Sequence, residues 1–227
     1  ADAQVITGLT GSVSSTNLGA TKEIGVTEWT LSNGVRVLLK PTDFNADQIS
    51  FTAYSPGGAS LLTDAAYPAA SAADLIPMTS GVGKFSVVDL QRFLAGKQVS
   101  VSPSIDDLSQ GFVGSASQRD VETMLQLVYL YFTEPRLDTA LVNTFLGRFR
   151  GVLANRSASP EAAFSDTLQV TMAQHSVREQ PVTAATLDKI DAFKSFDFYR
   201  DRFSDAGGFT FVFVGSFDLA TSFDVLQ

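Results

Sequence analysis

Residues 28–40 read EWTLSNGVRVLLK, and this segment predicts the first element of the fold. Apolar side chains alternate with polar ones on both sides of Asn33-Gly34, from Trp29 before the pair and from Val35 after it. Asn-Gly between alternating runs is a strong hairpin signal, because both central positions of the favoured two-residue turn need φ > 0. We therefore expect a β-hairpin over residues 26–40 that turns at Asn33-Gly34.

The other apolar patterns predict strands, helices, strands, helices, a strand and a helix, in that order along the chain. Period-two alternation and a closing apolar run predict further strands at residues 48–54, 99–105, 112–114 and 209–214. Helical spacing and start signals predict helices at residues 65–78, 86–96, 117–130, 138–155, from Ser159-Pro160-Glu161 onward, and at 186–203. This order is typical of an α+β fold, in which helices pack on a largely antiparallel sheet.

The chain divides into a linker or arm, residues 1–25, and a single α+β module, residues 26–227. The arm is rich in Gly, Ser, Thr and Ala and lacks sustained periodicity, although Val5-Ile6 favours a short strand. No signal peptide is visible at the start of the chain. Residues 218–227 have helical spacing without a stop signal, so we expect a fragment of a longer protein.

The inventory of possible ligands excludes most catalytic chemistry within this chain. It has one histidine, His175, and no cysteine. A catalytic zinc ion usually takes three protein ligands, so the common sets (three His, two His plus Glu, two Cys plus His) cannot be assembled. No G-x-S-x-G elbow accompanies His175. The net charge of -8 argues against nucleic acid as a partner, and no apolar run approaches the roughly 20 residues that span a bilayer.

Four segments also occur in the order and spacing of a known family. They are residues 28–40, Ser55-Pro56-Gly57-Gly58-Ala59-Ser60, Phe198-Tyr199-Arg200-Asp201-Arg202-Phe203, and residues 209–218, FTFVFVGSFD. Together they resemble the opening hairpin, the loop after the third strand, the closing helix and the last strand of pitrilysin/insulinase-family metallopeptidase modules. The likeness covers residues 26–227 and is greatest to the later, non-catalytic modules of large bacterial periplasmic members.

Active modules of that family carry an inverted zinc motif, His-x-x-Glu-His, and a downstream Glu that completes the metal site. The resemblance places the two His at Ala72 and Ile76, the general base at Leu75 and the downstream Glu at Leu153. Asp74 is the only acid in the window and stands one position off. The resemblance therefore implies an inactive peptidase-like module that holds no metal and no cofactor, with zinc expected in a separate catalytic module.

A few single residues allow a functional interpretation and a structural one. We expect His175 to be a surface or helix-end residue rather than a catalytic or metal-binding one. Asp106-Asp107 is expected to form a turn, because neighbours on a strand point to opposite faces. Arg148 and Arg150 lie in a predicted helix without acids. They form a solvated face or a contact with another module, or alternatively bind substrate carboxylates and carbonyls.

The resemblance implies a role as one wall of a chamber around peptide substrates in a periplasmic zinc endopeptidase. The catalytic partner would be a module of the same polypeptide or a sister subunit. The alternative is a binding or assembly module without peptidase activity, as in the inactive core subunits that this family contributes to respiratory complexes. An independent hydrolase with an unrecognised site is disfavoured by the ligand inventory.

Overall fold

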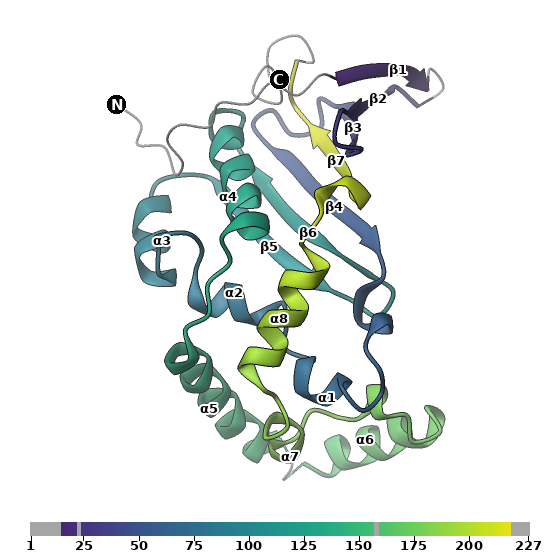
Figure 1. Cartoon of the computed structure of the whole chain (residues 1–227), viewed down its shortest axis with the longest axis vertical. Coiled ribbons are helices and arrows are strands. Elements are labelled where there is room, and N and C mark those ends of the chain that lie inside the picture. Colours follow the sequence, from purple (N-terminus) through teal and green to yellow (C-terminus); the bar gives the residue numbers. More distant parts are fainter. Residues whose placement is uncertain (1–14, 22–23, 157–158, 219–227) are drawn as a thin grey trace.

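A computed structural model describes residues 15–21, 24–156 and 159–218 (Figure 1). The sheet has seven strands in the order β1-β2-β3-β7-β4-β6-β5. Of the neighbouring pairs, β3 and β7 are parallel and the others are antiparallel. The strands are β1 (Ser15–Thr21), β2 (Val26–Leu31), β3 (Arg36–Pro41), β4 (Ile49–Pro56), β5 (Val99–Ile105), β6 (Ser109–Ala116) and β7 (Thr210–Gly215). The expectation of a largely antiparallel α+β sheet is confirmed.

The helices lie mainly between β4 and β7 in the sequence. The α-helices are α1 (Tyr67–Ala70), α2 (Leu75–Ser80), α3 (Val87–Leu94), α4 (Val121–Thr133), α5 (Thr139–Arg156), α6 (Pro160–Met172), α7 (Ala184–Leu187) and α8 (Ala192–Arg202). Short 3-10 turns are η1 (Gly58–Leu61), η2 (Gln118–Asp120), η3 (Val177–Glu179) and η4 (Ala206–Gly208). Figure 1 shows α4 and α8 on one face of the sheet, with α5, α6 and α7 gathered at its lower end.

The core lies between that sheet face and the helices. Buried and exposed residues alternate strictly along β4, so one face of the sheet is covered and the other faces solvent. Aromatic rings fill the covered side: Phe112 and Phe203 have centroids 4.9 Å apart, and Tyr199 stacks on Phe203 at 4.5 Å. Phe132 meets Phe209 edge-on at 5.0 Å. Many of the phenylalanines therefore form one core.

The predicted hairpin is present as β2 and β3, but its turn differs from the prediction. The amide of Gly34 donates to the carbonyl of Leu31 at 2.9 Å, and the amide of Leu31 donates to Val35 at 2.8 Å. Gly34 has φ of 90°, whereas Asn33 is not left-handed. The loop is therefore three residues long, with Gly at its left-handed position. Asn33 stabilises it differently, because its Oδ1 accepts the amide of Val35 at 3.2 Å.

Several start signals are confirmed and others need correction. Ser86 and Ser159 cap α3 and α6, each accepting a backbone amide three residues on. Ser117 does not cap α4, which begins at Val121 after the η2 turn. The helix expected over residues 186–203 is broken into α7 and α8, because Asp191 caps α8 by accepting the amides of Phe193 and Lys194. The helix expected over residues 65–78 is likewise split into α1 and α2.

The arm expected over residues 1–25 contains an element that its composition did not indicate. β1 pairs with β2 and forms one edge of the sheet, with an irregularity between Asn17 and Gly19. The strand expected near Val5-Ile6 and the helix expected over residues 219–227 lie outside the described residues. Within the described ranges, no helix is both long and apolar enough to cross a membrane.

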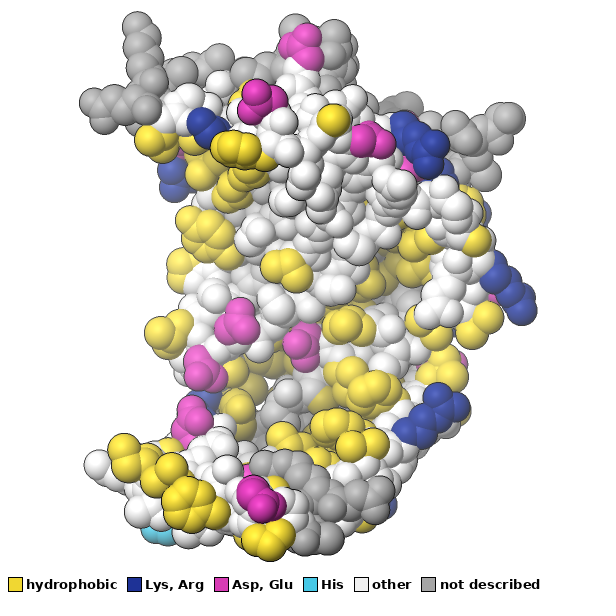
Figure 2. Space-filling view, turned by 180° about the vertical axis from the view of Figure 1, so that it is seen from behind, with side chains coloured by type: hydrophobic (Ala, Val, Ile, Leu, Met, Phe, Trp, Pro, Cys, Tyr) yellow, Lys and Arg dark blue, Asp and Glu magenta, His cyan; other side chains and the backbone are white. Residues whose placement is uncertain are grey.

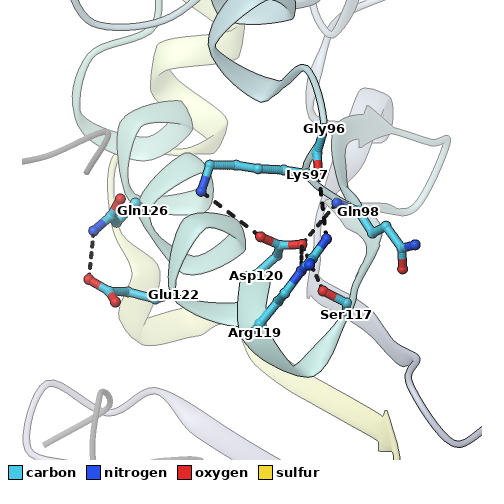
Figure 3. A network of polar contacts seen from close by, with 8 residues as sticks. All are labelled: Gly96, Lys97, Gln98, Ser117, Arg119, Asp120, Glu122 and Gln126. Atoms are coloured by element: carbon cyan, nitrogen blue, oxygen red, sulfur yellow. Dashed lines mark hydrogen bonds and ion pairs between the residues drawn. The ribbon is translucent and has the colours of Figure 1, made fainter. Parts of the chain in front are cut away.

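A buried carboxylate ties the start of α4 to the start of β5 (Figure 3). Asp120 accepts the hydroxyl of Ser117 at 2.7 Å and the amide of Gln98 at 2.9 Å. Arg119 and Lys97 add ion pairs at 3.4 Å and 3.9 Å. Burial by itself raises the pKa of Asp120, but the Ser117 and Gln98 hydrogen bonds and the Arg119 guanidinium outweigh it and lower the pKa.

Candidate functional site

The four positions where the resemblance places the zinc motif lie in and around α2 and α5. Ala72 is in the turn ahead of α2, and Leu75 and Ile76 form the start of that helix. Leu153 lies near the end of α5. Ile76 is fully buried, Ala72 is 7% exposed and Leu153 is 9% exposed. Three of the positions are therefore filled by buried apolar side chains, and Leu75 is half-buried.

A cavity of about 390 Å³ lies beside this window. Ala72, Asp74 and Leu75 line one side of it, and Phe145, Leu146 and Phe149 of α5 line another. The segment from η3 through α7 closes it with Val182, Leu187 and Ile190 among others. The rings of Phe145 and Phe149 are stacked with centroids 6.3 Å apart, and both side chains remain about two-fifths exposed, at 40% and 38%. The cavity is therefore an open pocket with an aromatic wall.

Asp74 is the acid that lines this cavity. Burial raises the pKa of Asp74, and the nearby carboxylate of Asp106 raises it further, while hydrogen bonds to backbone groups at Leu75, Ile105 and Asp74 itself oppose the shift. The carboxyl group therefore holds its proton to a higher pH than an exposed Asp does. Its carboxyl oxygens offer this pocket hydrogen-bond acceptors.

Two basic residues line the cavity, Arg178 and Lys189, and Arg178 has its hydrogen bonds committed within the module. Arg178 donates to Asp64 at 3.0 Å and to the carbonyls of Ala59 at 2.9 Å and Leu62 at 2.5 Å. Its guanidinium also lies over the ring of Tyr67, 4.9 Å from the centroid. Arg178 thereby fastens η3 to the loop that follows β4, and it supports the cavity rather than offering it a free charge.

The described ranges contain no group of three or more His, Cys, Asp or Glu side chains that could hold a metal ion. His175 is exposed, follows the end of α6 and does not line the cavity. Gln174 and His175 both have left-handed backbone, with φ of 51° and 59°, so this histidine serves to end a helix. Asp106-Asp107 lies in the connection between β5 and β6, as predicted, and its carbonyls accept the amides of Ala59 and Ser60.

Arg148 and Arg150 are both exposed on α5, but the structure does not bring them together. Residues two apart on a helix do not face each other. Arg150 forms an ion pair with Asp188 at the end of α7. Within the described ranges, no ion pair of Arg148 is found. Arg148 is therefore the better candidate for an external contact, and Arg150 joins α5 to α7.

The cavity itself was missed by the sequence reasoning. It depends on how α5 packs against α2 and α7, which no local pattern reveals. One signal was available in the sequence: α5 has more apolar residues than its buried side accommodates. The additional ones are Phe145, Phe149 and Val152, and Val152 is 61% exposed. These residues form a partly exposed apolar patch on α5.

Known proteins resemble this chain in sequence and in fold, although no family model matches it. A protein of Arabidopsis thaliana named zinc protease PQQL-like is 30% identical over 197 residues, which are 86% of this chain and 18% of the relative. The periplasmic protease PqqL from Escherichia coli has a TM-score of 0.73 at 20% identity, over 96% of this chain and 25% of that one. An inactive domain of peptidase M16 from Pseudomonas fluorescens has a TM-score of 0.70 at 13% identity, over 88% of this chain and 49% of that one.

The chain is related to the pitrilysin (M16) family of zinc proteases. The resemblance predicted from its hairpin, loop, closing helix and last strand is confirmed, and so is the α+β fold. The chain spans less than a fifth of the Arabidopsis relative, 18%, and a quarter of the E. coli protease, 25%. It therefore matches only a part of these longer proteins.

Proposed function

We propose that this chain is a non-catalytic module of a larger pitrilysin-family zinc metallopeptidase and forms part of the wall around its peptide substrates. One observation carries the first half: apolar residues occupy the two His positions, the base position and the downstream Glu position, namely Ala72, Ile76, Leu75 and Leu153. Zinc in proteins is bound by Cys, His, Asp or Glu side chains, so an ion there would lack ligands. Peptide hydrolysis then requires zinc held by a separate catalytic module.

The cavity supports the second half of the proposal. Its volume of about 390 Å³ falls within the range of small-molecule pockets, roughly 300–1,000 Å³. Phe145 and Phe149 offer an apolar wall, and Asp74 offers one polar group at its side. This chemistry suits an apolar side chain of a peptide together with a neighbouring backbone amide.

By analogy with the E. coli relative, whose name places it in the periplasm, we propose the same compartment for the parent protein.

The first test measures zinc and peptidase activity in the purified chain. We expect no stoichiometric zinc by elemental analysis and no cleavage of flexible peptides, because no described cluster of ligands exists. About one zinc ion per chain that disappears in Asp74→Asn would contradict the proposal. Zinc bridged between molecules through the exposed His175 is recognised by its loss in His175→Gln.

The second test concerns the wall. The parent polypeptide is prepared with Phe149→Ala in the cavity or with Phe193→Ala, a matched control on α8 that is 65% exposed and lies outside the cavity. We expect Phe149→Ala to weaken the binding of an apolar peptide about tenfold, because a lost aromatic contact costs about 1.4 kcal/mol or more. Phe193→Ala should leave it unchanged. Equal binding by both variants would remove the cavity from the functional account.

The arginines are tested on the same material. Arg148→Glu should weaken peptide capture without lowering the melting temperature, whereas Arg150→Glu should lower stability because it breaks the pair with Asp188. The double variant Arg150→Glu/Asp188→Arg should recover that stability. Unchanged affinity in Arg148→Glu would mean that this arginine is only solvated.

A parent polypeptide that binds partners but cleaves no peptide would support the alternative, a binding or assembly module.

A further inference from the structure

α6 exposes its largest apolar side chains. Its described residues include none that are buried. Phe164, Leu168 and Met172 are 69%, 51% and 77% exposed. Their spacing of four places them along one side of the helix, and we call these three residues the outward face of α6. Figure 2 shows hydrophobic side chains gathered over α6 at the lower left of the molecule.

The opposite side of α6 is the one that meets the module. Ala162, Asp166 and Val170, also spaced by four, are half-buried. A helix on the surface of an isolated domain usually turns its apolar stripe toward the core and its polar side toward water. α6 does the reverse, because a small, an acidic and a medium-sized residue face inward while Phe, Leu and Met face outward.

Internal contacts hold α6 only lightly. Ser159 caps its start by accepting the amide of Ala162 at 3.3 Å, and Gln169 donates to the carbonyl of Glu179 at 3.1 Å. An isolated helix of this length is marginal in water, since most helical stability in proteins comes from packing an apolar face. Contiguous exposed apolar side chains are typical of interaction sites. The outward face therefore has the composition and the geometry of an interface.

We propose that the outward face of α6 docks against an apolar surface of another folded module of the same polypeptide. This fold makes up 18% of the Arabidopsis relative and 25% of the E. coli protease, so most of a parent polypeptide of that length lies outside this chain. α6 has no Lys or Arg, and a helix that lies on anionic lipid or nucleic acid carries basic residues on its polar side. The proposal rests on the proposed function in one respect, the presence of further modules.

The test is hydrogen exchange at the backbone amides of α6, followed by mass spectrometry in the parent polypeptide and in this chain alone. We expect exchange at residues 161–173 to be at least about tenfold slower in the parent polypeptide, because docking adds a packed face to a marginal helix. The variant Phe164→Gln/Leu168→Gln/Met172→Gln should restore the fast exchange, since Gln keeps helix propensity while removing the apolar face. A matched control, Ala163→Gln, changes an exposed position of the same helix that does not neighbour the outward face, and it should leave the slow exchange intact.

Each other result overturns the proposal. Equal exchange in the two proteins means that nothing covers α6. Slow exchange that depends on protein concentration, in the chain alone, identifies a second copy as the occupant. Slow exchange that appears only after a peptide is added identifies a substrate surface. Peptidase activity is measured on the same preparation of the parent polypeptide, so the proposed function can fail or hold independently of the exchange result.

Discussion

Replacing Asp120 by alanine removes the acceptor that the buried hydroxyl of Ser117 shares with the amide of the exposed residue Gln98. Ser117 is 2% exposed, and its hydroxyl loses its 2.7 Å partner. The amide of Gln98 loses its 2.9 Å partner at the same time. Leaving a buried donor unpaired costs about 1–3 kcal/mol, so we expect Asp120→Ala to lower the free energy of unfolding by about 1–3 kcal/mol. Asp120→Asn keeps one carbonyl oxygen and should cost less, about 1–2 kcal/mol.

The pH dependence of this loss follows from the lowered pKa of Asp120. A carboxyl group whose pKa is lower in the folded chain than in the unfolded one contributes stability above its unfolded pKa, about 3.9. That contribution disappears as the pH falls through the folded pKa. The difference in unfolding free energy between the wild type and Asp120→Asn should therefore be largest near neutral pH and shrink below about pH 4.

Urea unfolding followed by circular dichroism at pH values from 7 to below the folded pKa measures both effects. Asp89→Asn is the matched control, because Asp89 also bonds a serine at a helix start but is 56% exposed. We expect it to cost less than about 0.5 kcal/mol. A loss under about 1 kcal/mol in Asp120→Ala, or a difference for Asp120→Asn that does not vary with pH, would refute the reasoning.

Two further substitutions test the site and the end of α6. Asp74→Asn should stabilise the chain near neutral pH, because the pKa of Asp74 is raised in the folded chain and its ionisation there lowers the free energy of unfolding. The wild type should regain that stability as the pH falls through the pKa of Asp74 in the folded chain. Urea midpoints at neutral and acid pH check this, and a less stable Asp74→Asn at neutral pH would contradict it. His175→Gly should raise the free energy of unfolding by about 0.5–1 kcal/mol. Glycine adopts without strain the left-handed backbone that His175 has at φ of 59°. The greater conformational entropy of glycine in the unfolded chain offsets part of this gain. A lower melting temperature in His175→Gly would show that the imidazole makes a stabilising contact.

Most of the sheet could be predicted because its signals are local. Apolar and polar residues alternate from Ile49 to Ala53, and burial alternates along the whole of β4. Ser86 and Ser159 stand where helix starts need an acceptor, and both caps form. The family resemblance added the order of the closing helix and the last strand. These features needed only the period of the apolar residues and the chemistry of a few turns.

The misses have two causes: alternative local hydrogen bonding, and contacts between residues that are distant in sequence. The side chain of Asn33 accepts a hydrogen bond from the amide of Val35, and Asn33 does not adopt a left-handed backbone. Both conformations are compatible with an Asn-Gly sequence. The break before α8 forms where the amide of Asp191 donates to the carbonyl of Ala69, far earlier in the chain. The cavity and the outward face of α6 likewise follow from tertiary placement. A helical period indicates that α6 is a helix but not which side meets the module.

The burial of the four proposed motif positions opposes the restoration of a zinc site, and this can be tested by introducing the family's residues there. In A72H/L75E/I76H/L153E, every residue of the family's site is present. Ile76 is fully buried and Leu153 is 9% exposed, so each loses apolar burial and brings a polar or charged group into the core. The cost is about 2–5 kcal/mol for each such position, against a total stability of about 5–15 kcal/mol for a domain.

The zinc ion could repay that cost only if the ligands converged. Ala72 lies in a turn ahead of α2 rather than on one helical face with Ile76, so its side chain is not placed by a shared helix. We therefore expect the quadruple variant to unfold, or to bind zinc weakly, and to show no peptidase activity when the zinc content and melting temperature of one sample are measured. The single variant A72H, at the edge of the cavity, should remain folded. A folded quadruple variant with one zinc ion per chain would mean that the apolar residues conceal an intact site, and that the module lost its ligands without losing its geometry.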